Sequence, residues 1–110
     1  MALSTVQFEI LFSLTEGRKH GYALILDVRT HVSGAGAATV YRSIERLQSD
    51  GLINPDGEEV VDGRLRRFYR LTDRGLVTLE DETRQMAERA QRALSRIRGQ
   101  QRPALKWGAA

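Results

Sequence analysis

The chain has 110 residues, a formal net charge of +3 and an ordinary apolar content. This is enough for one modest hydrophobic core and excludes a large two-domain enzyme. Because it contains no cysteine, disulfides, thiolate catalysis and cysteine-based zinc sites are excluded as well. No apolar run approaches the ~20 residues of a membrane span, and the first residues do not resemble a secretory signal. The absence of cysteine fits a cytoplasmic protein.

Three helices are predicted in the first half of the chain. The first follows a capping box, in which Ser4 caps the helix and Gln7 reaches back, and it is expected to end at Gly17. The second is predicted over about residues 20–32, and the third over about residues 37–49. The expected buried positions of these two helices are Tyr22, Leu24, Ile25, Val28, Val40, Ile44 and Leu47.

A β-hairpin is predicted next. Leu52-Ile53 begins a short apolar strand, and Pro55-Asp56-Gly57 is expected to turn away from it. Residues 58–61 then pair with residues 65–71 across Asp62-Gly63, because Gly adopts the positive φ of a two-residue turn at little cost. The predicted fold class is mainly α with a small β-hairpin, in the layout of a winged helix-turn-helix.

A long fourth helix is predicted over residues 73–98, with Thr72 as its N-cap. At ~1.5 Å per residue it would extend about 39 Å, more than a small core can cover, so we expect a second copy to meet it. The alternative is a lone solvent-exposed helix. The predicted dimerisation residues follow coiled-coil spacing: Leu76, Leu79, Thr83, Met86, Ala90, Ala93 and Ile97. The predicted domains are therefore a winged helix-turn-helix (1–72), a dimerisation helix (73–98) and a frayed tail (99–110).

Two segments carry the candidate DNA contacts. The third helix has polar side chains at its non-core positions, as a recognition helix requires. The returning strand of the hairpin is rich in arginine, whose planar fork suits phosphate and guanine. The candidate DNA-binding residues are Thr39, Tyr41, Arg42, Ser43, Arg46, Arg64, Arg66 and Arg67. The alternatives are a solvated helix face and a charged edge strand that prevents aggregation.

The ordered set His20-Gly21-Tyr22, Thr39-Val40-Tyr41, Arg46-Leu47, Gly51-Leu52-Ile53, Asp62-Gly63-Arg64, Arg67–Thr72 and Gly75 resembles the PadR family of bacterial transcriptional regulators. The resemblance covers about residues 3–98 and fits the branch with one short C-terminal helix. It implies a homodimer that binds a palindromic operator in double-stranded DNA, usually as a repressor, and that a small-molecule effector often releases. The chain departs from the family at Arg42, where proline is common, and at Gly36-Ala37-Ala38, which replaces a polar cap.

An enzyme is not expected, since the sequence has no cysteine nucleophile, no phosphate-binding glycine loop and no histidine–carboxylate pair at recognisable spacing. His20 and His31 are too sparse for a metal site, so no metal or cofactor is predicted. His20 is expected as a helix cap or a phosphate-facing residue. The predicted function is sequence-specific transcriptional regulation. Its alternatives are a winged-helix protein-interaction module and a ligand sensor that does not bind DNA directly.

Overall fold

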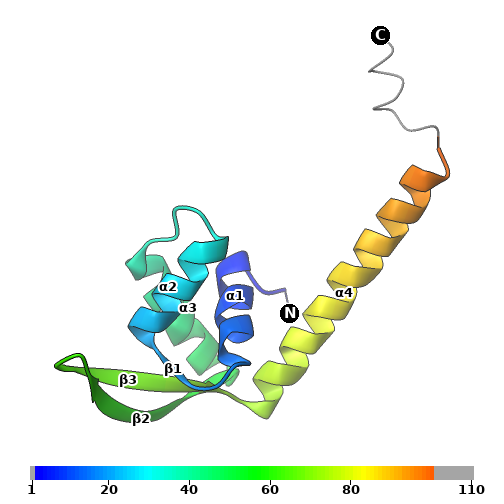
Figure 1. Cartoon of the computed structure of the whole chain (residues 1–110). Helices are drawn as coiled ribbons and strands as arrows, with labels where there is room; N and C mark the ends of the chain where they lie inside the picture. Colours follow the sequence, from blue (N-terminus) through cyan, green and yellow to red (C-terminus); the bar gives the residue numbers. More distant parts are fainter. Residues whose placement is uncertain (1, 101–110) are drawn as a thin grey trace. The chain divides into compact units, whose positions relative to one another are not determined.

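The computed structural model describes residues 2–100, which form four helices and three strands (Figure 1). In chain order the elements are α1 (Thr5–Leu14), β1 (Lys19–His20), α2 (Gly21–His31), α3 (Ala37–Ser49), β2 (Ile53–Val61), β3 (Arg64–Leu71) and α4 (Asp73–Arg98). This confirms the predicted fold class. The chain has two compact units, divided between Glu80 and Asp81, so α4 begins in the first and continues into the second. The predicted domain limits stay a prediction, and residues 101–110, with Trp107, lie outside the described residues.

The three strands form one antiparallel sheet in the order β1-β3-β2. The predicted hairpin is confirmed, with Val61 opposite Arg64. Its turn residues Asp62 and Gly63 have φ values of 51° and 78°. A tight two-residue turn of this kind requires positive φ at both positions, which explains the Asp-Gly pair.

Two parts of the sheet differ from the prediction. The strand β1 was not predicted, because two residues carry no periodicity; it pairs Lys19 with Tyr69 and His20 with Phe68. The turn expected at residues 55–57 was wrong. The strand β2 continues through this segment with a shift of register between Pro55 and Glu58, so Pro55 sits at a bulge, where a missing N–H is tolerated.

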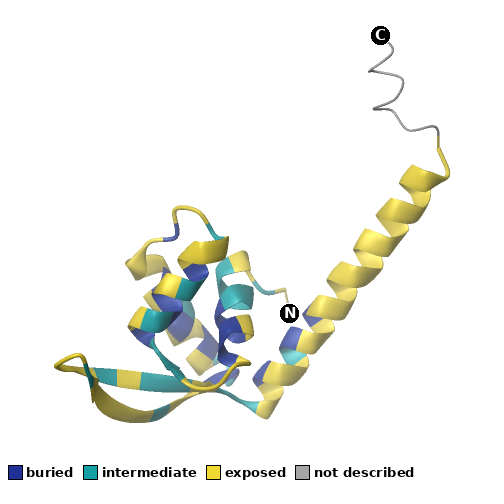
Figure 2. Cartoon of the chain, in the orientation of Figure 1, coloured by how far each residue is buried: buried dark blue, intermediate teal, exposed yellow. Residues whose placement is uncertain are grey.

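The hydrophobic core of the first unit lies between α1, α2, α3 and the start of β2, and Figure 2 shows its buried positions in dark blue. Its largest fully buried side chains are Ile10, Leu11, Leu24, Val28, Val40, Ile44, Leu47, Leu52 and Ile53. The expected core position of Tyr22 was wrong, since this side chain is 47% exposed. The ring of Tyr22 lies instead under the guanidinium of Arg66, 5.1 Å from ring centroid to Cζ.

The helix ends follow from their caps. Ser4 Oγ accepts a hydrogen bond from the Gln7 N–H at 3.1 Å, and Gln7 Oε1 accepts one from the Ser4 N–H at 2.9 Å, which confirms the capping box. α1 ends at Leu14 and not at Gly17, because the hydroxyl and the N–H of Thr15 both bond the carbonyl of Phe12.

The start of α4 is fixed to the start of β2 by Thr72 and Gly75. Thr72 Oγ1 accepts from the Gly75 N–H at 3.0 Å, the predicted N-cap, and donates to the Gly51 carbonyl at 2.8 Å. The Thr72 N–H also donates to the Leu52 carbonyl, at 3.1 Å. Because Gly75 has no side chain, its backbone can approach Leu52 closely; a Cβ there would lie 2.0 Å from the Leu52 oxygen.

A polar cluster joins α1, β1 and α2 beside this core. Lys19 Nζ donates to Asp27 Oδ2 at 2.6 Å and to Ser13 Oγ at 3.0 Å, and Ser13 Oγ donates to the same carboxylate. Lys19 also pairs with Glu16 at 2.9 Å. Partial burial raises the pKa of Asp27, but the hydrogen bonds from Lys19 and Ser13 outweigh it, so the pKa lies below its ordinary value. Burial likewise lowers the pKa of Lys19, and its bonds to Asp27 and Glu16 outweigh that effect and raise it.

We expect Gly75→Ala to destabilise the chain by about 1–3 kcal/mol or more, because backbone atoms must move to accept the new methyl group. The free energy of unfolding in urea measures this. Gly99→Ala is the matched control, since its Cβ would meet only ordinary contacts at 3.5 Å. Equal stability of the two variants would contradict the close packing at Gly75.

We expect Asp27→Asn to cost about 1 kcal/mol near pH 7, a modest value because the carboxylate is 41% exposed. A depressed pKa contributes stability above the unfolded-state value of about 3.9, and this contribution disappears as pH falls through the folded-state value. The difference in unfolding free energy between wild type and Asp27→Asn should therefore shrink as the pH falls below about 3.9. Glu16→Gln, at the more exposed partner of Lys19, is the control and should cost less. A pH-independent difference would exclude the charge as its cause.

Candidate nucleic-acid interface

The helix α3 presents one apolar and one polar face. Its buried residues Val40, Ile44 and Leu47 were all predicted, and they fix which side chains point away from the core. Of the predicted DNA-binding residues of α3, Ser43 is half-buried and the other four are exposed: Thr39, Tyr41, Arg42 and Arg46. The polar face therefore projects from a rigid, buried stripe, the arrangement that a recognition helix needs.

The polar residues of α3 fall into two groups by their contacts. Arg42 Nη2 lies 3.4 Å from Thr39 Oγ1, so these two side chains are together in the first half of the helix. Arg46 Nε donates to Asp50 Oδ2 at 3.3 Å, which directs this guanidinium toward the C-terminal end. Recognition helices present mostly their N-terminal residues to base edges. Thr39 and Arg42 are therefore better placed than Arg46 to read a sequence.

The arginines of β3 also differ in their surroundings. We call the whole hairpin, residues 53–71, the wing. Arg64 and Arg67 are exposed on it. Arg66 is half-buried against the Tyr22 ring. Its Nε is buried and has no hydrogen-bond partner among the described residues. The structure thus brings Arg64 and Arg67 to the surface of the wing and holds Arg66 at the junction with α2.

Arg18 holds the base of the wing and was not singled out in the sequence. Its guanidinium lies over the Phe68 ring, 4.2 Å from the centroid, and Nη1 donates to the Asp56 carbonyl at 3.1 Å. It also forms an ion pair with Glu59, whose register partner on β3 is Arg66. The ion pair with Arg18 partly neutralises the negative charge of Glu59, which lies close to the wing arginines. No local sequence pattern marks Arg18, since all three partners lie 38 or more residues further along the chain.

The predicted dimerisation residues of α4 do not share one environment. Leu79 is 6% exposed and belongs to the core of its own unit, so it has little surface left for a dimer seam, and the predicted seam stays a prediction. Leu76 is half-exposed, and every residue from Thr83 to Arg98 is exposed. The exposed set contains Met86, Ala90, Ala93 and Ile97, and also Leu94, which the predicted seam does not include.

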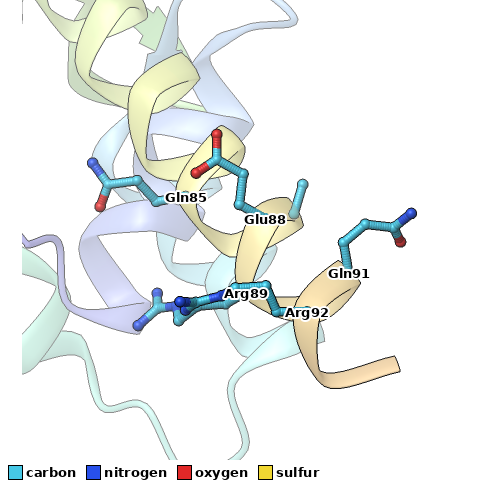
Figure 3. Close-up of a pocket in the computed structure, with 6 residues that line it drawn as sticks. Gln85, Glu88, Arg89, Gln91 and Arg92 are labelled. Carbon is cyan, nitrogen blue, oxygen red and sulfur yellow. The ribbon is translucent and has the colours of Figure 1, made fainter. Parts of the chain in front are cut away.

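The polar side of the same helix segment carries alternating amide and charged side chains. Figure 3 shows Gln85, Glu88, Arg89, Gln91 and Arg92 extending from α4 around a hollow. Within residues 2–100, the residues that line this hollow all come from α4, as in a gap between neighbouring side chains of one helix. A gap of this kind has no opposite wall to enclose a ligand.

Two other kinds of site are not found in the described part of the chain. Residues 2–100 contain no group of three or more histidine, cysteine or acidic side chains placed to hold a metal ion. Over the same residues, no helix combines the length and the apolar character needed to cross a membrane.

Comparisons with known proteins agree with this geometry. Residues 10–81 match the model of the transcriptional regulator PadR-like family. The chain is 33% identical over 91 residues to transcriptional regulator Rv3488 of Mycobacterium tuberculosis (strain ATCC 25618 / H37Rv), an alignment that covers 83% of this chain and 84% of that protein.

Two solved structures share the fold. The PadR-like transcriptional regulator BC4206 from Bacillus cereus strain ATCC 14579 has a TM-score of 0.74 at 21% identity, over 87% of this chain and 94% of its own. Bacillus subtilis PadR in complex with operator DNA has a TM-score of 0.60 at 22% identity, over 69% and 45%. Members of the matched family are regulators of transcription and not enzymes. On the family match and the relative that is one-third identical, the chain belongs to the PadR-like family of transcriptional regulators.

Proposed function

We propose that the chain is a sequence-specific DNA-binding regulator whose helix α3 enters the major groove of its operator. The observation that carries this proposal is the exposed pair Thr39 and Arg42 on the first half of α3, opposite a fully buried apolar face. An arginine and a hydroxyl can bond base edges there, where each base pair has its own pattern of donors and acceptors. Tyr41, Ser43 and Arg46 would complete this surface with contacts to bases or to phosphates.

The wing would bind the DNA backbone. The exposed Arg64 and Arg67 both lie on β3 after the hairpin turn, where guanidinium groups can reach phosphates or the adjacent minor groove. Arg66 is a weaker candidate than the sequence indicated, because the Tyr22 ring already covers its guanidinium. Bacillus subtilis PadR, which shares the fold, has been solved in complex with operator DNA, and this supports DNA binding by the chain in general.

We propose further that two copies associate through the second half of α4. Met86, Leu94 and Ile97 expose 40–52% of their side chains, and Ala90 and Ala93 between them would let a partner helix approach closely. Burial of such side chains favours association. A homodimer predicts a palindromic operator, because the symmetry of the protein is repeated in its site. Binding at an operator would make the protein a repressor in the usual manner of the family, and it would act in the cytoplasm, where bacterial DNA lies.

The release of DNA by a small-molecule effector stays a prediction from the family resemblance. The hollow along α4 is lined by one helix and does not support it. The two rival functions, a protein-interaction module and a ligand sensor, both require that the wing and α3 leave DNA untouched. Binding to a duplex therefore separates them from the proposal.

We expect the variant Arg64→Ala/Arg67→Ala to bind specific and random duplexes more weakly to the same degree. Removal of each arginine–phosphate interaction should lower the slope of log K against log salt concentration by about 0.9. Fluorescence anisotropy of labelled duplexes over a range of salt concentrations measures this slope. Arg70→Ala is the matched control, an exposed arginine on the same strand but nearer the helices, and should leave the slope unchanged. An unchanged slope in the double variant would mean that the wing does not touch the backbone.

A further inference from the structure

The first turn of α2 lies between the two elements that the proposed interface uses. The strand β1 pairs with β3 of the wing, and α2 begins at the next residue. α2 in turn packs against α3 as well as against β3 (Figure 1). The segment His20-Gly21-Tyr22 therefore has the wing on one side and the recognition helix on the other.

On the wing side this segment makes two ring contacts. The His20 ring meets Phe68 edge to face, with centroids 5.3 Å apart and planes at 88°. The Tyr22 ring lies beneath the Arg66 guanidinium. His20 is also fixed in orientation, because its Nδ1 accepts the Ala23 N–H at 3.2 Å and so caps α2. Backbone pairing of His20 with Phe68 completes the attachment to the wing.

On the side that faces α3, the segment contacts the Tyr41 ring, and this contact is possible because Gly21 has no side chain. A Cβ on Gly21 would lie 2.9 Å from Cε1 of the Tyr41 ring and 3.5 Å from its hydroxyl oxygen. Carbon atoms pack at about 3.5–4.0 Å, so this ring occupies the space that any other residue at position 21 would need. Tyr41 lies directly beside Arg42 and two residues from Thr39, in the part of α3 that is proposed to read bases.

We propose that Gly21 is a positioning residue for DNA recognition, which lets Tyr41 seat against α2 and thereby sets α3 relative to the wing. This inference rests on the DNA-binding function proposed above. A methyl group at position 21 would displace the Tyr41 ring from this seat, and with it a contact between the first half of α3 and α2, while the wing stays attached through His20. Base contacts depend on placement to a fraction of an ångström, whereas phosphate contacts by long arginine side chains tolerate such shifts. Specificity should therefore suffer more than affinity for DNA in general.

The test compares the full chain carrying Gly21→Ala with one carrying Gly99→Ala. Each binds an operator duplex selected from a random pool and a scrambled duplex of equal length. Gly21→Ala should lower the ratio of operator affinity to scrambled affinity by about tenfold, the lower end of what one base-specific hydrogen-bonded pair supplies. Affinity for the scrambled duplex at low salt should stay within about twofold, because it rests on the phosphates. Gly99→Ala, whose Cβ meets only ordinary contacts, should change neither value.

Making Gly21→Ala in a chain that already carries Tyr41→Ser separates a positioning role of Gly21 from a general structural effect. Tyr41→Ser removes the ring that the new methyl group would meet, so Gly21→Ala should change the ratio little further in that background. Equal losses of affinity for both duplexes in both backgrounds would assign Gly21 a structural role alone and overturn the proposal. If Gly21→Ala does not fold, Phe68→Leu is used instead, because it changes the contact between His20 and the wing. Its readout is again the ratio of operator affinity to scrambled affinity.

The two possible failures are distinct. A wild-type chain that selects no duplex contradicts the DNA-binding function, and the positioning role with it. A wild-type chain that selects an operator, together with an unchanged ratio in Gly21→Ala or in Phe68→Leu, contradicts the positioning role alone.

Discussion

The pairing of a two-residue strand with the wing is the contact on which the rest of the interface depends. A two-stranded ribbon is only marginally stable in isolation, and a third strand gives it a fixed attachment. β1 supplies this strand and continues directly into α2. Arg18 on one side of β1 holds the wing through Phe68, Asp56 and Glu59, while Lys19 within it holds α1 and α2 through Ser13 and Asp27. The wing is thereby fixed to the helices that carry the proposed recognition surface.

The elements that could be predicted are those with a local signal. The three buried residues of α3 repeat at helical spacing, the Asp62-Gly63 turn has its own backbone requirement, and the limits of α3 and α4 follow from nearby caps and breaks. The elements that were not predicted depend on distant partners. β1 becomes a strand only because Tyr69 and Phe68 lie opposite it, and the bulge at Pro55 becomes visible only in the register with β3.

The candidate site follows the same division. Exposed polar residues on α3 could be assigned from periodicity alone, because their apolar neighbours fix the buried face. The separate roles of the wing arginines could not, since they depend on which guanidinium a ring or a carboxylate holds. Tyr22 was expected in the core and lies instead against Arg66, and Leu79 was expected in a dimer seam and lies in the core. In both cases a spacing rule identified an apolar position but not its partner.

Net charge alone says little about this protein, because its arginines differ in what they contact. Those at positions 18 and 66 are held by aromatic rings, and the one at position 46 is held by a carboxylate. Such contacts orient a guanidinium and also reduce what it can offer to a phosphate. Arg64 and Arg67 form no ion pair or side-chain hydrogen bond within residues 2–100, which leaves their donors for a partner. A net charge of +3 is therefore compatible with a cationic strand β3, which carries four arginines and no acid.

We propose that two copies of this chain read a palindromic DNA sequence with α3 and the wing. Selection of bound duplexes from a random pool by the intact protein tests it most directly. We expect enrichment of an inverted repeat, with half-sites separated by about one or two helical turns. Enrichment of a single, asymmetric half-site would contradict the dimer, and a pool that stays random through repeated selection would contradict sequence-specific DNA binding.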